Sequence, residues 1–226
     1  MRYPTVTPVL AILLGLLFAP LAIAADGAAA PAATEEAGSF PKPSPYPITW
    51  EFKFEHSAPK RIVVDVPGGA AQAFWYMTYK VTNTTEQPRT FLPVFEMLME
   101  DGKVHRSDRN IPYKVFTEIK AREKNKFLEH FTQIGGEVRI GEDEARDGVA
   151  IWKEPNPEMG TFSIFLTGLS GEAVRLKDAE GKDVKGADGQ SIILRKTLQM
   201  NYFVRGDEVY PGQDEVNTRP EAWIMR

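Results

Sequence analysis

The residue types that most often carry catalysis or metal binding are sparse in this chain. It has three histidines, His56, His105 and His130, and no cysteine. The histidines are far apart and fit no H-x-H, H-E-x-x-H or H-x-x-E-H spacing, so we expect isolated histidines on exposed loops or strand edges. The lack of cysteine excludes a disulfide framework, a thiolate zinc site, an iron–sulfur cluster and a cysteine nucleophile.

Ser170 is the serine whose surroundings come nearest to a nucleophile motif. It lies in Gly168-Leu169-Ser170-Gly171, which is one residue out of step with G-x-S-x-G. That motif also needs a strand–turn–helix context in a parallel sheet, whereas the flanking residues here alternate as antiparallel strands do. We therefore interpret Ser170 as a turn residue.

Carboxylates could act without histidine, either as a catalytic pair or as ligands for a hard cation such as Ca²⁺. Loop 142–147 is the densest group, with Arg146 as its one positive charge and four acids: Glu142, Asp143, Glu144 and Asp147. Its spacing matches no EF-hand loop, and a solvated acidic loop explains it more simply. The sequence therefore predicts no catalytic, cofactor-binding or metal-ligating residue and no cofactor.

The basic stretch 120–126 is the best candidate for contact with an anionic glycan or a lipid headgroup. It holds Glu123 and four cations: Lys120, Arg122, Lys124 and Lys126. On a helix, residues two apart are rotated by about 200°, so these side chains would not share a face. A solvated helix surface is the simpler interpretation.

The aromatic residues could stack on sugars if a sheet exposed them. The chain has 13 Phe, 7 Tyr and four Trp, at positions 50, 75, 152 and 223. Three of the tryptophans alternate with polar residues along expected strands, which favours burial in a core. Phe74 and Tyr76 lie on the opposite parity from Trp75 and Met77, so we expect a central strand covered on both faces rather than an exposed aromatic patch.

The elements that must position these residues are mainly strands. Apolar residues recur with period two in several segments: 50–54, 62–66, 75–81, 91–99, 149–151, 162–166 and 192–202. Pro-Gly, Asn-Thr, Asp-Gly and Gly-Gly turns separate them. We predict a mainly β fold, an antiparallel immunoglobulin-like β-sandwich, with residues 173–194 as a projecting hairpin. One helix is expected at 112–123, and it could extend to 131.

The order of segments predicts export. Residues 1–24 read as a signal peptide, because a weakly positive start precedes an apolar stretch that ends in Ala22-Ile23-Ala24. The uncharged run 9–25 contains Pro20 and is shorter than the roughly 20 apolar residues of a membrane helix. We expect no stable membrane span after cleavage, a flexible Ala/Pro-rich linker at 25–47 and a single β-sandwich domain at 48–226.

Several motifs of this domain resemble those of a set of uncharacterised exported bacterial proteins. They are Gly148-Val149-Ala150-Ile151-Trp152, Gly168-Leu169-Ser170, Lys196-Thr197-Leu198, Arg205-Gly206-Asp207-Glu208 and Trp223-Ile224-Met225-Arg226. The resemblance covers most of residues 48–226. It implies a secretory address and an immunoglobulin-like sandwich, and it implies no activity, ligand or site residue.

Composition bounds the function without naming it. With 27 basic and 31 acidic residues the net charge is −4, which argues against a nucleic-acid binder. We expect an exported, non-catalytic module in the periplasm or outside the cell that contacts an unknown envelope protein or polymer. The alternatives are a carbohydrate- or small-ligand-binding sandwich and, after it, a hydrolase with dispersed carboxylates. The sequence does not indicate the oligomeric state.

Overall fold

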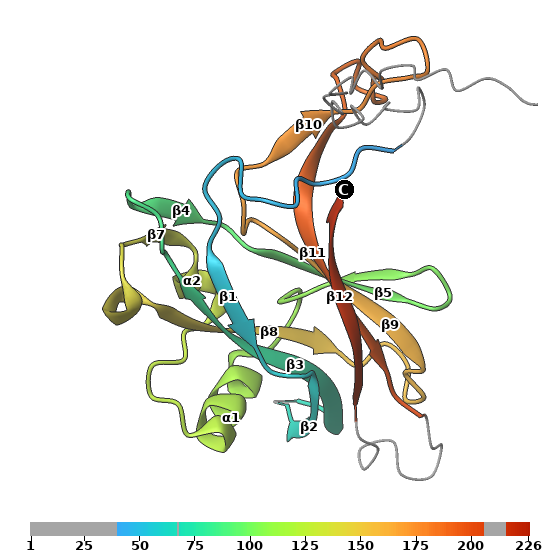
Figure 1. Ribbon diagram of the computed structural model, residues 1–226. Coiled ribbons are helices and arrows are strands. Elements are labelled where there is room, and N and C mark those ends of the chain that lie inside the picture. Colours follow the sequence, from blue (N-terminus) through green and yellow to red (C-terminus); the bar gives the residue numbers. More distant parts are fainter. Residues whose placement is uncertain (1–39, 67, 206–215) are drawn as a thin grey trace, which may run out of the picture. The chain divides into compact units, whose positions relative to one another are not determined.

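The computed structural model describes residues 40–66, 68–205 and 216–226 (Figure 1). The predicted signal peptide and most of the predicted linker lie outside the described residues, as do residues 206–208 of the Arg-Gly-Asp-Glu motif. The fold is mainly antiparallel β, as the period-two segments predict. Its immunoglobulin-like topology stays a prediction.

The first sheet is centred on β3 (Ala71–Thr82). β8 (Arg146–Lys153) pairs along one edge of β3. β2 (Lys60–Asp65) and β1 (Lys53–His56) pair with its first and last residues in turn, and so share the other edge. All three pairings are antiparallel.

The second sheet follows the order β10-β11-β9-β5-β6, with β12 also paired to β11. Its strands are β5 (Val94–Met99), β6 (Val104–Arg106), β9 (Thr161–Thr167), β10 (Ala173–Arg175), β11 (Ile193–Phe203) and β12 (Asn217–Met225). A separate two-stranded sheet joins β4 (Arg89–Phe91) to β7 (Gly136–Val138).

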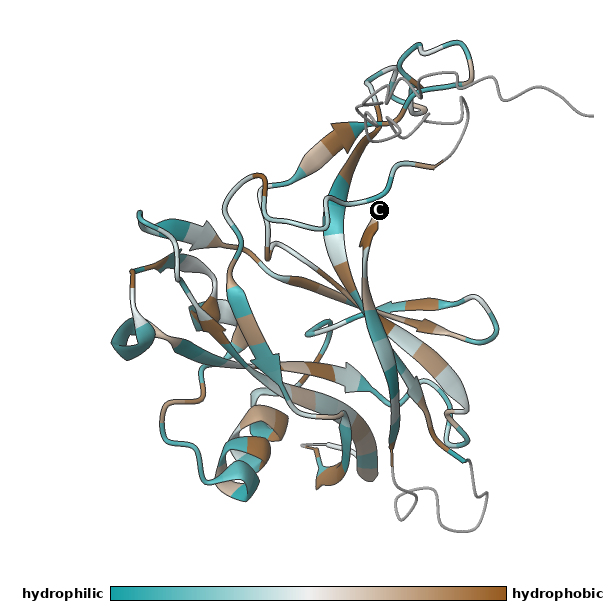
Figure 2. Ribbon diagram, in the orientation of Figure 1, coloured by the Kyte–Doolittle hydropathy of each residue, from teal (hydrophilic) through white to brown (hydrophobic). Residues whose placement is uncertain are grey.

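Side chains of both larger sheets meet in one apolar cluster. Trp75, Met77 and Tyr79 of β3 pack there with Phe95 of β5 and Met200 of β11, and all five are buried. Figure 2 shows hydrophobic and hydrophilic residues alternating along these strands. Side chains alternate between the two faces of a strand, so alternate residues of each sheet lie on the same face. The apolar residues on the facing sides of the two sheets form this shared core.

The opposite face of β3 forms a second core with a helix. Phe74 and Tyr76 are buried with Val115, Phe116 and Ile119 of α1 (Tyr113–Glu123). This confirms that β3 is covered on both faces, and it explains why aromatic residues occupy both parities of the strand.

The helix has the predicted bounds within one residue, but it does not extend to 131. It ends where Lys124 takes a left-handed conformation with φ of 53°. The side chain of Asn125 then accepts the Phe127 N–H at 2.9 Å, which closes a turn instead of another helical turn. Three short elements that the sequence did not predict follow: α2 (Phe131–Ile134), β7 of the two-stranded sheet and a 3₁₀ turn, η1 (Glu142–Glu144).

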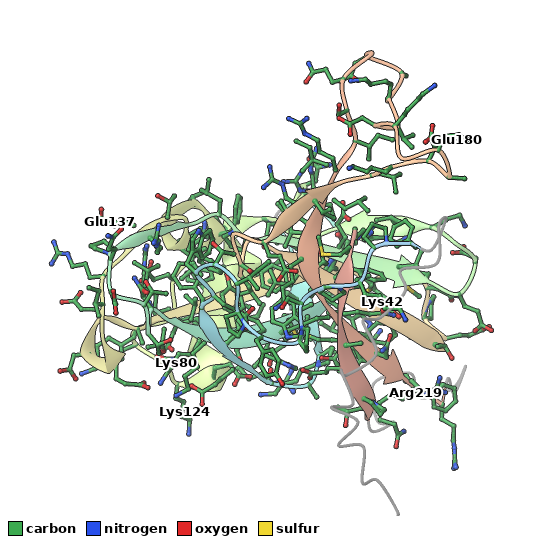
Figure 3. All side chains as sticks on the ribbon, turned by 45° about the horizontal axis from the view of Figure 1, so that its top comes forward. Lys42, Lys80, Lys124, Glu137, Glu180 and Arg219 are labelled. Atoms are coloured by element: carbon green, nitrogen blue, oxygen red, sulfur yellow. The ribbon has the colours of Figure 1, made fainter. Side chains whose placement is uncertain are left out.

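Residues 173–194 form the expected hairpin. β10 pairs with the start of β11, and isolated bridges join Lys177 to Asp183 and Lys185 to Ser191. Figure 3 shows Glu180 on this loop, beyond the ends of the strands.

Candidate functional site

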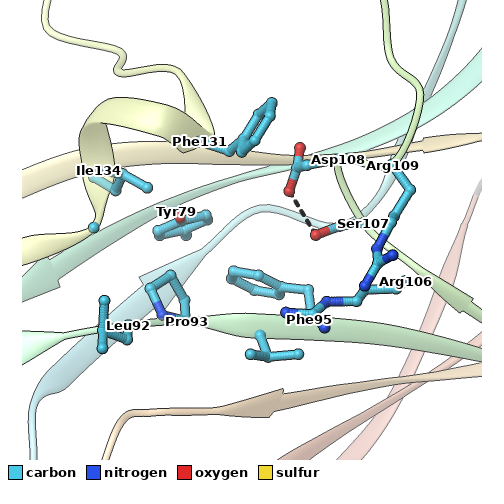
Figure 4. Close-up of a pocket in the computed structure, with 12 residues that line it drawn as sticks. Tyr79, Leu92, Pro93, Phe95, Arg106, Ser107, Asp108, Arg109, Phe131 and Ile134 are labelled. Atoms are coloured by element: carbon cyan, nitrogen blue, oxygen red, sulfur yellow. Dashed lines mark hydrogen bonds between the residues drawn. The ribbon is translucent and has the colours of Figure 1, made fainter.

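A cavity of about 360 Å³ lies between the start of β5, the turn that follows β6, and α2 (Figure 4). Tyr79 of β3 and Phe95 of β5 line it, together with residues 92–94, 106–109 and parts of α2. The pocket has an apolar wall and a polar wall.

The apolar wall is formed by Leu92, Phe95, Phe131 and Ile134. Phe95 and Ile134 are buried, whereas Phe131 is 39% exposed and Leu92 is 65% exposed. The interior of the pocket is therefore fixed by the core, and its mouth presents apolar surface to solvent.

His130 positions Phe131 at that mouth. Its ring lies 4.2 Å from the Phe131 ring, centre to centre, and 5.0 Å from that of Phe116 on α1. Its Nδ1 accepts the Thr132 N–H and so caps the first turn of α2. Burial lowers the pKa of His130, which keeps the ring neutral and suited to this aromatic packing.

The polar wall is the turn that begins where β6 ends. Asp108 has φ of 60°, a left-handed conformation that Asp tolerates better than most residues. Its N–H donates to the Ile151 carbonyl at 2.7 Å. Its carboxylate accepts the Ser107 hydroxyl at 2.5 Å and the Ile151 N–H at 3.3 Å, so β8 holds this turn from behind.

The charges of this turn are not paired with one another. Burial raises the pKa of Asp108 to about 7, against the opposing effect of its hydrogen bonds to Ser107 and Ile151. Arg106 and Arg109 are exposed, and within the described part of the chain neither forms an ion pair. Figure 4 shows both arginines on the side of the pocket away from Ile134. Among the described residues, the pocket thus combines two arginines that form no ion pair with a carboxyl group whose pKa burial raises to about 7.

The residues that line this pocket lack the paired carboxylates of a typical glycoside hydrolase. Asp108 is the one acid among the residues that line the pocket. Retaining and inverting hydrolases use two carboxyl groups on opposite sides of the bond that breaks.

A second cavity, of about 370 Å³, gathers acids from two loops: Glu100, Asp101 and Glu158. Lys103 bonds to Asp101 at 2.6 Å and holds the pKa of that carboxyl below its usual range. Over residues 40–66, 68–205 and 216–226, no group of three or more His, Asp or Glu side chains could hold a metal ion.

The histidines of the sequence are not brought together. His56 bonds to Glu221 of β12 at 2.8 Å, which joins the edges of the two sheets. His105 is half-buried beside the second cavity. His130 is buried rather than exposed as we expected, because three aromatic rings surround it.

The charged side chains of the acidic loop 142–147 and of the basic stretch 120–126 do not gather in one site. In the acidic loop, Glu142 pairs with Lys53 at 3.0 Å, and Asp147 accepts the Asn125 amide at 2.9 Å. In the basic stretch, Lys120 donates to the Leu128 carbonyl and Arg122 to the Arg61 carbonyl. Both stretches therefore brace neighbouring segments of backbone and side chain.

Ser170 and the tryptophans have structural surroundings. The Ser170 hydroxyl accepts the Glu172 N–H at 3.1 Å in a buried turn. Trp75 and Trp152 are buried, whereas Trp50 and Trp223 pack at the edge of the core. Trp50 also lines a third cavity of about 410 Å³ with polar residues of the loop 84–89.

Sequence reasoning missed the pocket because its parts are remote from one another. The string Arg106-Ser107-Asp108-Arg109 shows two cations around a carboxyl. Nothing in its spacing indicates that Phe131 and Leu92 face it, since this depends on the position of α2 beside β5.

No protein-family model, no curated protein and no solved structure matches this chain. Among the residues that the structure describes, no helix is both long and apolar enough to cross a membrane.

Proposed function

We propose that the chain is an exported, non-catalytic binding module of the cell envelope and that the pocket between Arg106, Arg109 and Phe131 is its binding site. The observation that carries this proposal is a pair of arginines that have no ion-pair partner among the described residues and face the same cavity as the exposed Phe131. Concave sites with an apolar lining and a few convergent polar groups are the usual form of ligand sites.

Export is proposed from the signal pattern of residues 1–24, and the periplasm or the cell exterior is the corresponding location. An immunoglobulin-like sandwich is proposed for the domain, and the apolar cluster shared by its two sheets supports it. The ligand would be a small molecule, or a group that protrudes from an envelope protein or polymer, because the site is a pocket rather than a flat face.

The proposal is tested by retention of envelope components. The chain is immobilised, an envelope extract is passed over it, and mass spectrometry compares what the wild type and an Arg106→Gln/Phe131→Ala variant retain. Arg139→Gln is the matched control, because Arg139 is exposed and lies outside the pocket. A component kept by the wild type and the control but lost by the pocket variant supports the site, whereas equal retention by all three chains would refute it.

A hydrolase is the second candidate, and Asp108 is the observation that favours it. A carboxyl with a pKa of about 7 could serve as a general acid near neutral pH. This candidate expects Asp108→Asn to abolish turnover of a retained polymer while leaving its binding intact. The single acid of the pocket places the hydrolase below the binding module.

A further inference from the structure

We propose that the pocket takes a small organic anion, with its carboxylate or phosphate monoester held by Arg106 and Arg109 and its planar or hydrocarbon body lying on Phe131 and Leu92. This inference rests on the proposed function and names the ligand class of the same site. It follows from the charges around the two arginines, from the shape of the pocket and from its apolar mouth.

Two acids that the fold places beside the arginines, Glu96 and Asp108, are already engaged. Glu96 is the cross-strand partner of Arg106 in the β5–β6 pair, yet its carboxylate binds Arg226 at 2.7 Å. Arg226 in turn lies over the ring of Phe165 at 4.4 Å, so this pairing is held in place from a second side. Glu96 is therefore not left to neutralise Arg106.

Asp108 is the other acid within reach of the pocket, and it also leaves the arginines free. Its two oxygens accept hydrogen bonds from Ser107 and Ile151, and no ion pair joins it to Arg106 or Arg109 in the described residues. Burial keeps this carboxyl partly neutral, so it repels an incoming anion less than an ordinary aspartate would. The guanidinium groups are thus available to an external anion, for which their fork of donors suits carboxylate and phosphate oxygens.

The apolar wall favours a ligand with an apolar body over a bare inorganic ion. Phe131 and Leu92 expose apolar surface at the mouth, and Phe95 and Ile134 continue this surface inside the pocket. The volume of about 360 Å³ is near the lower end of small-molecule sites. A body about the size of one aromatic ring would cover these side chains while its anionic group reaches the arginines.

Four probes separate the two parts of this recognition: phenylacetate, phenyl phosphate, the uncharged phenylacetamide and inorganic phosphate. Each is titrated into the full chain by calorimetry. Hydrogen bonds to charged groups contribute about 1.5–3 kcal/mol, so at least one of the two aromatic anions should bind about 10- to 100-fold more tightly than the amide. The stronger of the two anions identifies the preferred anionic group. Inorganic phosphate should bind more weakly than phenyl phosphate, because it leaves the apolar wall uncovered.

Variants assign each contribution to its residues. Arg106→Gln/Arg109→Gln should reduce the preference for the anion over the amide to near unity, and Phe131→Ala should weaken the aromatic anion and the amide alike. Arg139→Gln is the matched charge control and should leave every affinity unchanged. Thermal melting of each variant shows that the fold is retained, since both arginines and Phe131 are exposed.

Failure of this inference can be told apart from failure of the proposed function. If phenylacetamide binds as tightly as phenylacetate and Phe131→Ala weakens both, the pocket binds ligands but the anionic class is wrong. The class is also wrong if no probe binds while the envelope component is still lost from the pocket variant. If neither the probes nor an envelope component depends on the pocket, the proposed function itself is refuted.

Discussion

At the scale of single residues, Asp108 is the group whose surroundings are least expected for its type. A carboxyl normally loses its proton well below neutral pH. This one is buried against β8, accepts hydrogen bonds from a hydroxyl and a backbone N–H, and has no ion-pair partner among the described residues. The fold therefore holds a proton near neutral pH at the edge of the pocket, and its free energy of unfolding must depend on that proton.

Replacing Asp108 by Asn should remove a pH dependence of stability. Because burial raises the pKa of Asp108 to about 7, the folded state binds this proton more tightly than the unfolded state does. Its contribution to stability is complete below the unfolded pKa near 4 and is lost as the pH rises to about 7, by at most about 1.4 kcal/mol per pH unit. Urea unfolding is measured from pH 4 to 8. The free energy of unfolding of the variant should rise relative to that of the wild type between pH 4 and about pH 7, and the difference should then stay constant.

Asp143→Asn, in the exposed acidic loop, serves as the control and should keep the wild-type profile. An unchanged profile for Asp108→Asn would show that Asp108 is ionised in the folded protein across this range.

Gly148 is a second residue whose type is dictated by a neighbour. It lies opposite Tyr79 in the β3–β8 pair, and a Cβ there would lie 2.4 Å from Cζ of the tyrosine ring. Tyr79 is buried and packs against the rings of Phe91 and Phe95, so its ring cannot shift freely to make room for a Cβ. Gly148→Ala should lower the free energy of unfolding by about 1–3 kcal/mol, measured by urea titration.

Gly69→Ala is the comparison, because the nearest atom to its added Cβ would lie 3.7 Å away. The free energy of unfolding of this variant should be close to that of the wild type. Equal stability of the two variants would mean that Tyr79 does not occupy the space beside Gly148.

At the scale of elements, three distant segments are joined by a buried ion cluster. Lys196 of β11 is 3% exposed and forms ion pairs with Glu51 at 2.8 Å and with Glu172 at 3.4 Å. Glu172 also accepts the Ser44 N–H at 2.7 Å, which fixes the end of the predicted linker to the domain. The Lys196 ammonium lies 4.9 Å from the Trp223 ring of β12 as well. The cluster thus connects the chain before β1 to the second sheet.

Lys196→Met should be among the most destabilising single changes in the chain. It removes the cation and leaves two largely buried carboxylates without a partner, which costs about 3–5 kcal/mol in comparable buried pairs. Chemical denaturation measures the loss. Lys103→Met breaks an exposed pair with Asp101 and should have little effect, so a similar loss in both variants would contradict the buried cluster.

The sequence predicts an element correctly where its local hydrophobic pattern matches the burial that the fold gives it. Period two marks the strands, and the unusual parity of Phe74 and Tyr76 is enough to predict a strand covered on both faces. α1 ends at the left-handed Lys124, and α2 begins after the N-cap His130. Helix propensity alone does not determine where a helix in this region ends or whether a second one begins.

The candidate site could not be predicted, because its residues meet only in the tertiary structure. Leu92, Asp108 and Phe131 of the candidate site come from widely separated segments. The same is true of the ion cluster of Glu51, Glu172 and Lys196. Each residue has an ordinary type and neighbourhood in the sequence. Their chemistry arises from pairing across strands and from desolvation, and neither leaves a periodic signal along the chain.

At the scale of the whole molecule, the proposal joins an export address to a cysteine-free domain. A chain without cysteine can occupy an oxidising compartment without forming wrong disulfides, and here two apolar clusters and buried ion pairs stabilise the described domain. Because Ser44 is bound to the domain, only the part of the predicted linker before it would separate the domain from whatever the exported chain meets first.

Export makes a simple prediction about the mature chain. Protein recovered from the envelope fraction should begin at Ala25, because the signal pattern places cleavage after Ala24. The intact mass and the N-terminal sequence of the recovered protein measure this. A chain that still carries Met1 to Ala24 would contradict cleavage and favour an uncleaved anchor.

The most direct test of the account is to map where an envelope ligand binds on the chain. The isotope-labelled protein is mixed with a small-molecule extract of the envelope, and the changes in its amide NMR signals are assigned to residues. The account predicts changes centred on Ser107 to Arg109 and on Phe131, which the Arg106→Gln/Arg109→Gln variant loses. Changes centred elsewhere, such as around Trp50, or no changes at all, would contradict it.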